Sequence, residues 1–172
     1  LYTGGPMPIS WTPFGELFSG VFMGMIIILL AFFIQTGNVN GFVVWISLPI
    51  VITIGLINMA NNIRDRVKDK ASGRKTLPIL LGKKASITFM AAMYILAYLI
   101  VIFTALFKSG GSLFYLLVLF SFPMPIKAIR RFNKNDTPAS MMPAMAATGK
   151  TNTIFGILYA LGIYISALLG GI

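Results

Sequence analysis

The sequence predicts an all-α protein, a multi-pass bundle of about five transmembrane helices. Hydrophobic residues fill 57% of the 172 positions, whereas only 10% are charged. A typical soluble domain is about one-quarter charged, so this chain has too few charged side chains to cover a surface in water. Five stretches are mainly apolar over the roughly 20 residues that a helix needs to cross a bilayer. We therefore expect lipid to be the solvent for most of the chain.

The five predicted spans are separated by two short turns and two long polar loops. The spans are expected at residues 14–35, 42–60, 85–107, 113–129 and 153–169, and the long loops at 61–84 and 130–152. Pro123 and Pro125 fall in the fourth span and are expected to kink it, because proline removes a backbone donor. Gly20 and Gly24 in the first span are spaced like a face for close helix packing.

Basic residues are concentrated on one predicted side of the membrane. The net charge is +10, from 14 Lys+Arg against 4 Asp+Glu. If the helices alternate in direction, every basic residue except Lys108 falls on the side of the two long loops. The positive-inside rule then places the N-terminal end and both loops in the cytoplasm, with the protein in the cell membrane. This distribution accounts for the charge, so we expect a lipid bilayer and no nucleic acid among the partners.

The sequence contains no cysteine and no histidine. Disulfides, a thiolate nucleophile and cysteine metal sites are therefore excluded, as is the usual general base near neutral pH. Any metal site must use oxygen ligands, which favours a hard ion such as Mg²⁺.

Polar residues that follow the second span suggest where the chemistry lies. If the helix continues past the lipid, Asn58, Asn62, Asp65 and Asp69 fall on one face at spacings i, i+4, i+7 and i+11, and Asn61 borders them. Two like charges at i and i+4 repel each other, so a cation between them is a physical reason for the pair. Neighbouring basic residues suit a phosphorylated ligand: Arg64, Lys68, Lys70, Arg74 and Lys75. The pattern therefore indicates a metal–diphosphate site.

A solvated helix face with local ion pairs is the alternative interpretation of the same pattern. The asparagines would then cap the helix or bind neighbouring helices. Two aspartates four residues apart do not separate the two interpretations by themselves.

The wider pattern is more specific. Residues 61–82 read N-N-I-R-D-x-x-x-D-x-x-x-G-R-K-T-L-P-x-x-L-G, and the chain opens with Y-T-G-G-P at 2–6 and T-P-F-G-E at 12–16. These strings resemble the UbiA-type intramembrane prenyltransferases, and most of all the 1,4-dihydroxy-2-naphthoate polyprenyltransferases (MenA-like) of menaquinone synthesis. The resemblance extends over essentially the whole chain.

The resemblance implies that residues 1–172 are the C-terminal part of a single domain, from the fifth to the ninth helix of a nine-helix fold. The family uses two aspartate-rich motifs to hold Mg²⁺ against an allylic diphosphate. Only the second motif is present here, so the chain is expected to be part of a longer protein and inactive alone. Pro6 stands where many members carry a lysine, which fits a subfamily with a different aromatic acceptor.

Residue roles follow from the same resemblance. Asp65 and Asp69 match the second motif and are implied to be the catalytic metal ligands. The implied substrate-binding residues are Tyr2, Asn61, Asn62, Arg64, Lys68, Arg74 and Lys75. Among them, Lys68, Arg74 and Lys75 are assigned by charge and proximity. The implied partners are a polyprenyl diphosphate and an aromatic acceptor.

The activity implied is transfer of a polyprenyl group from an allylic diphosphate to an aromatic acceptor, 1,4-dihydroxy-2-naphthoate in the preferred assignment. Another branch of the family, with a different acceptor, is the first alternative. A small membrane transporter is an alternative from another class, although the predicted spans are nearly free of the charged groups that transport pathways use. A non-catalytic scaffold with a lipid-headgroup patch is a third.

Overall fold

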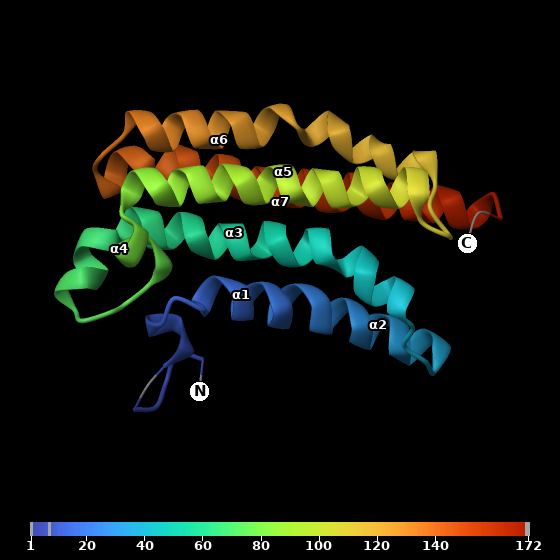
Figure 1. Cartoon of the computed structure of the whole chain (residues 1–172), viewed down its shortest axis with the longest axis horizontal. Coiled ribbons are helices and arrows are strands. Elements are labelled where there is room, and N and C mark those ends of the chain that lie inside the picture. The colour runs from blue at the N-terminus through green and yellow to red at the C-terminus, as the bar shows by residue number, and fades with distance from the viewer. Residues whose placement is uncertain (1, 7, 171–172) are drawn as a thin grey trace.

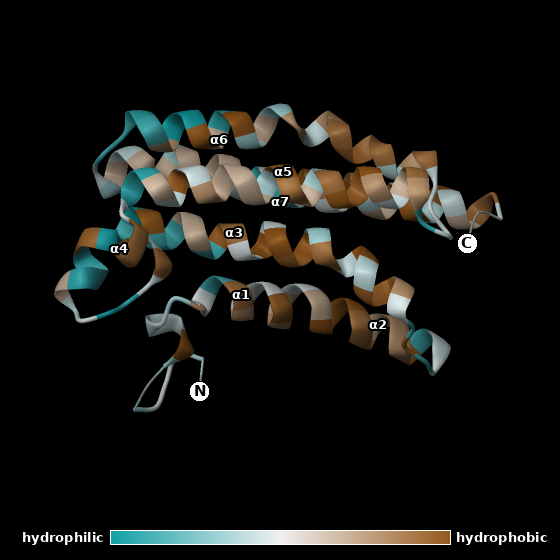
Figure 2. Cartoon of the chain, viewed as in Figure 1, coloured by the Kyte–Doolittle hydropathy of each residue, from teal (hydrophilic) through white to brown (hydrophobic). Residues whose placement is uncertain are grey.

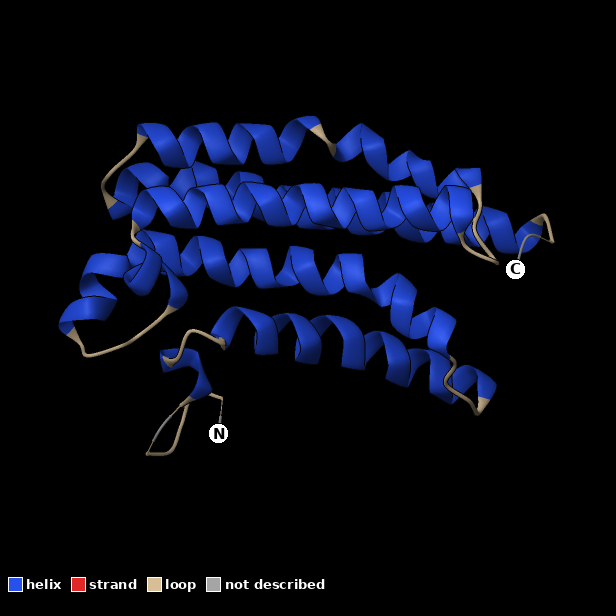
Figure 3. Cartoon of the chain, viewed as in Figure 1, coloured by secondary structure: helices blue, strands red, loops and turns tan. Residues whose placement is uncertain are grey.

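The computed structural model describes residues 2–6 and 8–170, and these ranges contain helices and turns but no β-strand (Figure 1, Figure 3). Five helical spans are long and apolar enough to cross a membrane, which confirms the predicted count. The first span combines α1 (Gly15–Gly20), a π-helical stretch η2 (Val21–Ile26) and α2 (Ile27–Thr36). The others are α3 (Gly41–Ala71), α5 (Lys83–Phe107), η3 (Leu113–Ser121) with α6 (Pro123–Lys134), and α7 (Pro138–Leu168). Two short elements, η1 (Ile9–Trp11) and α4 (Leu77–Leu81), lie outside the spans.

The two long loops predicted at 61–84 and 130–152 are mostly helical, and this part of the prediction was wrong. The helix α3 continues to Ala71, and α7 begins at Pro138 rather than near residue 153. Thr137 caps α7 through a reciprocal pair of hydrogen bonds with Ser140, with Pro138 in the first turn. Hydropathy marks where the lipid-compatible surface ends, whereas caps decide where a helix ends. The helices of the second and fifth spans were therefore predicted too short.

The prolines of the fourth span interrupt it as predicted. A 3₁₀ segment ends at Ser121, and α6 begins at Pro123, with Phe122 between them. Figure 3 shows this interruption as a short tan segment within the upper helix. Pro123 and Pro125 lie in the first turn of α6, where their missing N–H groups cost no intrahelical bond.

The helix α3 occupies the centre of the described bundle. It contacts α1, η2 and α2 on one side, and α5 and α7 on the other. The contact with the first span is backbone-close, because a Cβ at Gly20 would lie 2.3 Å from the Val51 carbonyl oxygen and a Cβ at Gly55 would lie 2.9 Å from that of Glu16. Gly20 and Gly24 thus form the packing face that their spacing indicated, and α3 is its partner.

The remaining helices share an apolar core with α3. Its fully buried side chains include Met59, Met90, Val101, Phe132 and Phe155. The first span contributes little to this core and leaves large apolar side chains such as Phe22, Ile27 and Ile34 exposed. Dispersion contacts and close backbone approach, rather than a hydrophobic gradient, are what hold such helices together in lipid.

The polar connections gather at one end of the bundle. The N-terminal segment, the connection from α3 through α4 to α5, and the turn between α6 and α7 all lie at the left in Figure 1. The turn from α2 to α3 and the turn from α5 to η3 lie at the other end. Figure 2 shows hydrophilic residues concentrated at the left ends of α3 and α6. The helices therefore bring together the two basic regions that the sequence assigned to one side, and their cytoplasmic orientation stays a prediction.

Candidate functional site

The candidate site lies where the end of α3 meets the N-terminal segment and the turn before α4. At about 1.5 Å per residue, the 31 residues of α3 extend about 46 Å, well beyond a hydrocarbon core of about 30 Å. The polar residues from Asn61 onward therefore form a helical extension beyond the apolar part of the span. Ser72 caps this extension, and Gly73 turns the chain with a φ of 83°.

The continuous helix places Asn58, Asn62, Asp65 and Asp69 on one face, as their spacing predicted. Asn62 and Asp69 are buried, whereas Asp65 keeps a third of its side chain exposed. We call these four residues the polar stripe.

Arg64 forms a two-point ion pair with Asp65. Its Nε donates to Asp65 Oδ1 over 2.8 Å, and its Nη2 donates to Oδ2. Arg64 Nη1 lies 2.9 Å from the sulfur of Met145 in α7, which fixes the guanidinium between the two helices. The hydrogen bond from Arg64 holds the pKa of Asp65 below its usual value, so this carboxylate is ionised at neutral pH.

Asp69 has one oxygen paired and one free. Its side chain is nearly buried, and Oδ1 lies 3.4 Å from Arg74 Nη1. Its other oxygen, Oδ2, is buried and has no hydrogen-bond partner among the described residues. A buried carboxylate oxygen without a partner is costly. A hard cation would satisfy it, so the oxygen donors of the polar stripe fit Mg²⁺.

The two aspartates would supply only part of a metal's ligands. Residues 2–6 and 8–170 contain no cluster of three or more acidic side chains that could hold an ion. Magnesium commonly takes one or two protein carboxylates and completes its octahedron with waters and phosphate oxygens.

The N-terminal segment folds against this end of α3. The Tyr2 hydroxyl accepts a hydrogen bond from Asn58 Nδ2 over 3.3 Å and donates to the Gly15 carbonyl over 3.2 Å. The backbone N–H of Lys75 donates to the Trp11 carbonyl over 2.8 Å, and the guanidinium of Arg74 lies 5.7 Å from the centre of the Trp11 ring. Tyr2 and Arg74, both predicted from sequence, are thus brought to the polar stripe, and Trp11 joins them without having been predicted.

Other predicted residues lie at the same end of α3 but outside these contacts. Lys68 and Lys75 have exposed side chains, and Asn61 is half-buried. In the described parts of the chain none of the three makes a side-chain hydrogen bond or ion pair with protein. Their predicted substrate-binding roles stay predictions.

Sequence reasoning missed Glu16 as a member of the site. Asn62 Nδ2 donates to Glu16 Oε1 over 2.8 Å, and both residues are buried. The available indication was a single acidic residue at the start of an apolar span, because ionisable groups are rare there and usually functional. Glu16 also stands in the T-P-F-G-E string that carried part of the resemblance.

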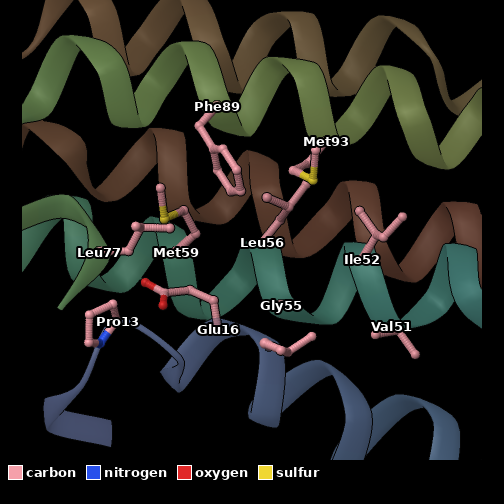
Figure 4. Close-up of a pocket in the computed structure, with 11 residues that line it drawn as sticks. Pro13, Glu16, Val51, Ile52, Gly55, Leu56, Met59, Leu77, Phe89 and Met93 are labelled. Carbon is pink, nitrogen blue, oxygen red and sulfur yellow. The ribbon is translucent and has the colours of Figure 1, made fainter. Parts of the chain in front are cut away.

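A cavity of about 260 Å³ lies beside the Glu16 carboxylate. It lies between α1, α3, α4 and α5 and is partly open at the surface of the bundle, and among the described residues that line it Glu16 alone is ionisable, the others being apolar side chains and Gly55. Figure 4 shows the carboxylate between α1 and α3, directed toward Met59 and Leu77, with Phe89 and Met93 across the cavity. The site therefore combines a charged, metal-compatible surface with an adjoining apolar chamber.

Comparison with known proteins gives a consistent result. Residues 1–154 match the model of the UbiA prenyltransferase family. The 1,4-dihydroxy-2-naphthoate octaprenyltransferase of Bacillus subtilis (strain 168) is 48% identical over 167 residues, covering 96% of this chain and 53% of that protein. The UbiA prenyltransferase domain-containing protein 1 homolog of Drosophila melanogaster is 33% identical over 92% of this chain and 42% of its own length. The Homo sapiens UbiA prenyltransferase domain-containing protein 1 is 26% identical over 96% of this chain and 47% of its own length. The chain spans about half the length of these curated relatives.

Proposed function

Because this chain belongs to the UbiA prenyltransferase family, we propose that it supplies the second aspartate motif of an enzyme that transfers a polyprenyl group to 1,4-dihydroxy-2-naphthoate. The relative from Bacillus subtilis carries that acceptor in its name and is 48% identical. The observation that carries the proposal is the polar stripe, with its ionised Asp65 and the unpartnered oxygen of Asp69.

Asp65 and Asp69 would hold Mg²⁺ at the end of α3. When bound, Mg²⁺ neutralises the charge that develops on the leaving diphosphate. Arg64 keeps Asp65 ionised, and Arg74 holds one oxygen of Asp69, so both carboxylates are oriented before the ion arrives. Asn61 and Asn62 add amide groups along the same turns.

The basic side chains around the stripe would bind the diphosphate. Arg74 uses one nitrogen on Asp69, which leaves other guanidinium donors for phosphate oxygens. Lys68 and Lys75 are exposed beside it and supply mobile positive charge. Their position at the end of the span keeps the diphosphate in the aqueous layer.

The apolar parts of the bundle would accommodate the polyprenyl chain in or beside the lipid. As the bond between the allylic carbon and the diphosphate oxygen breaks, a ring carbon of the acceptor forms the new carbon–carbon bond, and the ring loses its carboxyl group as carbon dioxide. Aromatic faces stabilise the positive charge on the allylic group, and Tyr2 and Trp11 are aromatic residues tied to the site by contacts. In this proposal the end of the bundle that carries the basic residues faces the cytoplasm.

Substitution of the two aspartates tests this function in the full-length protein. Asp65→Asn and Asp69→Asn keep the side-chain shape but remove the charge that a cation needs. Transfer of a labelled polyprenyl diphosphate to 1,4-dihydroxy-2-naphthoate should fall by roughly 100-fold or more, since charge stabilisation by a metal is worth several kcal/mol. Chelation of Mg²⁺ should abolish transfer in the unmodified protein, and added Mg²⁺ should restore it.

Asp136→Asn is the matched control for these variants. Asp136 is exposed at the same end of the bundle and pairs with Lys83, away from the stripe. Near-normal transfer by D65N and D69N would mean that these acids are ordinary surface charges. If the unmodified protein transfers the prenyl group to 4-hydroxybenzoate and not to the naphthoate, the acceptor assignment is wrong and the protein belongs to another branch of the family.

A further inference from the structure

Glu16 has a buried oxygen with no partner among the described residues. The residue is only 8% exposed, and its Oε1 accepts a hydrogen bond from Asn62. Its other oxygen, Oε2, is buried and makes no hydrogen bond with any residue that the structure describes. An orphaned carboxylate oxygen in apolar surroundings is expensive, so a ligand that brings a donor would find a strong partner there.

The cavity beside Glu16 is of a size for a small ring. Its volume of about 260 Å³ is below the range of about 300–1,000 Å³ for drug-sized ligands. Across it lie Met59, Phe89 and Met93 (Figure 4), and thioether and aromatic side chains pack favourably on ring faces. A long polyprenyl chain would need an extended groove instead.

The cavity adjoins the proposed diphosphate site along α3. Glu16 is bound by Asn62, which lies three residues before Asp65 on the polar stripe. Met59 and Leu56 line the cavity on the preceding turns, and Leu77 closes it shortly after Arg74 and Lys75. A ring in the cavity would therefore lie on the membrane side of the charged groups.

The free oxygen distinguishes between the two substrates of the proposed reaction. The hydrocarbon part of a polyprenyl chain has no hydrogen-bond donor and would leave Oε2 unsatisfied. The aromatic acceptor carries hydroxyl groups, which donate. Only the acceptor therefore matches both the apolar walls and the carboxylate.

We propose that the cavity is the acceptor subsite and that Glu16 Oε2 accepts a hydrogen bond from a ring hydroxyl of the acceptor. This inference rests on the proposed function and adds the residue that orients the second substrate. Asn62 is a positioning residue in this arrangement, because its amide holds the other oxygen of Glu16. A hydroxyl that donates to a carboxylate also releases more electron density into the ring, which favours attack by the ring carbon.

Glu16→Gln in the full-length protein tests the contact. The variant preserves the shape and can still accept from Asn62, but it presents an N–H donor where Oε2 stood. We expect the KM for 1,4-dihydroxy-2-naphthoate to rise about 10- to 100-fold, as for loss of a charge-assisted hydrogen bond, and the KM for the polyprenyl diphosphate to stay within about twofold.

A binding titration without diphosphate measures the contact independently of turnover. Fluorescence titration of the purified full-length protein should show weaker binding of 1,4-dihydroxy-2-naphthoate to E16Q than to the unmodified protein. Binding of 2-naphthoate, which lacks the hydroxyls, should be the same for both. An equal loss for the two ligands would assign Glu16 a purely structural role and overturn the inference.

Met93→Phe is a second variant that tests the cavity itself. A larger side chain there should reduce acceptor binding and leave the KM for the polyprenyl diphosphate unchanged. Met23→Phe, on an exposed face of the first span, is the volume-matched control. A rise in the KM for the polyprenyl diphosphate alone would mean that the cavity holds the prenyl chain, which contradicts the proposal.

The proposed function and the acceptor subsite are overturned by different results. If the unmodified protein transfers no prenyl group to the naphthoate, the proposed function fails. If it does so and E16Q and M93F both keep the normal KM and binding affinity for the acceptor, only the acceptor subsite is overturned.

Discussion

At the scale of single residues, Arg74 has the most connected position among the predicted diphosphate contacts. Its guanidinium lies against Asp69 and over the Trp11 ring, and its backbone N–H donates to the Asp69 carbonyl over 3.0 Å. Charge and proximity to the aspartates predicted this arginine, without distinguishing it from Lys68 or Lys75. The contacts make it different, because a planar guanidinium can stack flat on an indole and present two parallel donors in a fixed fork, whereas an ammonium is a compact point charge without that geometry.

Arg74→Lys should therefore weaken diphosphate binding although it keeps the charge. Loss of stacking and of a directed hydrogen bond is worth about 1–2 kcal/mol, which corresponds to a rise of about 5- to 30-fold in the KM for the polyprenyl diphosphate. Steady-state kinetics of the full-length protein measures this effect. Lys134→Arg, at the same end of the bundle on α6, is the control. An unchanged KM in R74K would show that only the positive charge matters.

At the scale of elements, the contact between the first span and α3 depends on three glycines. Gly20 and Gly24 meet the backbone of Val51, and Gly55 meets that of Glu16. This close approach fixes the start of α1 against α3, which sets where Glu16 meets Asn62. The π-helical stretch at Val21–Ile26 lies in the same contact. The distance between the backbones of α1 and α3 therefore determines whether Glu16 can reach Asn62.

Gly20→Ala should destabilise the protein, because the added Cβ would lie 2.3 Å from the Val51 carbonyl oxygen. Relief of that clash requires the helices to separate, and overpacking of this kind typically costs about 1–3 kcal/mol. Thermal unfolding in detergent should show a lower Tm. Gly156→Ala in α7 is the matched control, since a Cβ added at Gly156 would meet no described atom of another residue within 4 Å. Equal Tm values for the two variants would contradict the packing argument.

At the scale of the whole molecule, the bundle separates a polar, basic end from an apolar middle. Both basic regions reach the same end because successive spans alternate in direction, and α3 and α7, each 31 residues long, also extend beyond the lipid-matched length. That end also holds the polar stripe and the N-terminal segment. The polar end can thus bind a charged diphosphate while the apolar middle, next to it, accommodates the attached hydrocarbon chain.

Cysteine labelling tests the sidedness. This chain has no cysteine of its own, so single substitutions in a cysteine-free full-length protein are readily interpreted. Ser72→Cys should react with a membrane-impermeant maleimide only from the cytoplasmic side, because it follows the basic end of α3. Asn38→Cys and Ser109→Cys, in turns at the opposite end, should react only from the other side. Labelling of all three from one side would contradict a five-span arrangement.

The sequence by itself determined the number of spans, the gathering of basic residues on one side and the spacing of the aspartates. These are local properties: hydropathy is read along one segment, and the helical repeat fixes which neighbours share a face. Tertiary structure decided how far α3 and α7 extend, and which groups meet across the chain. Tyr2 reaches Asn58 across 56 residues, and Glu16 reaches Asn62 across 46. No local pattern specifies such pairs, because they depend on how the first span and the segment before it pack against α3, and the glycines in that contact set how closely the two helices approach.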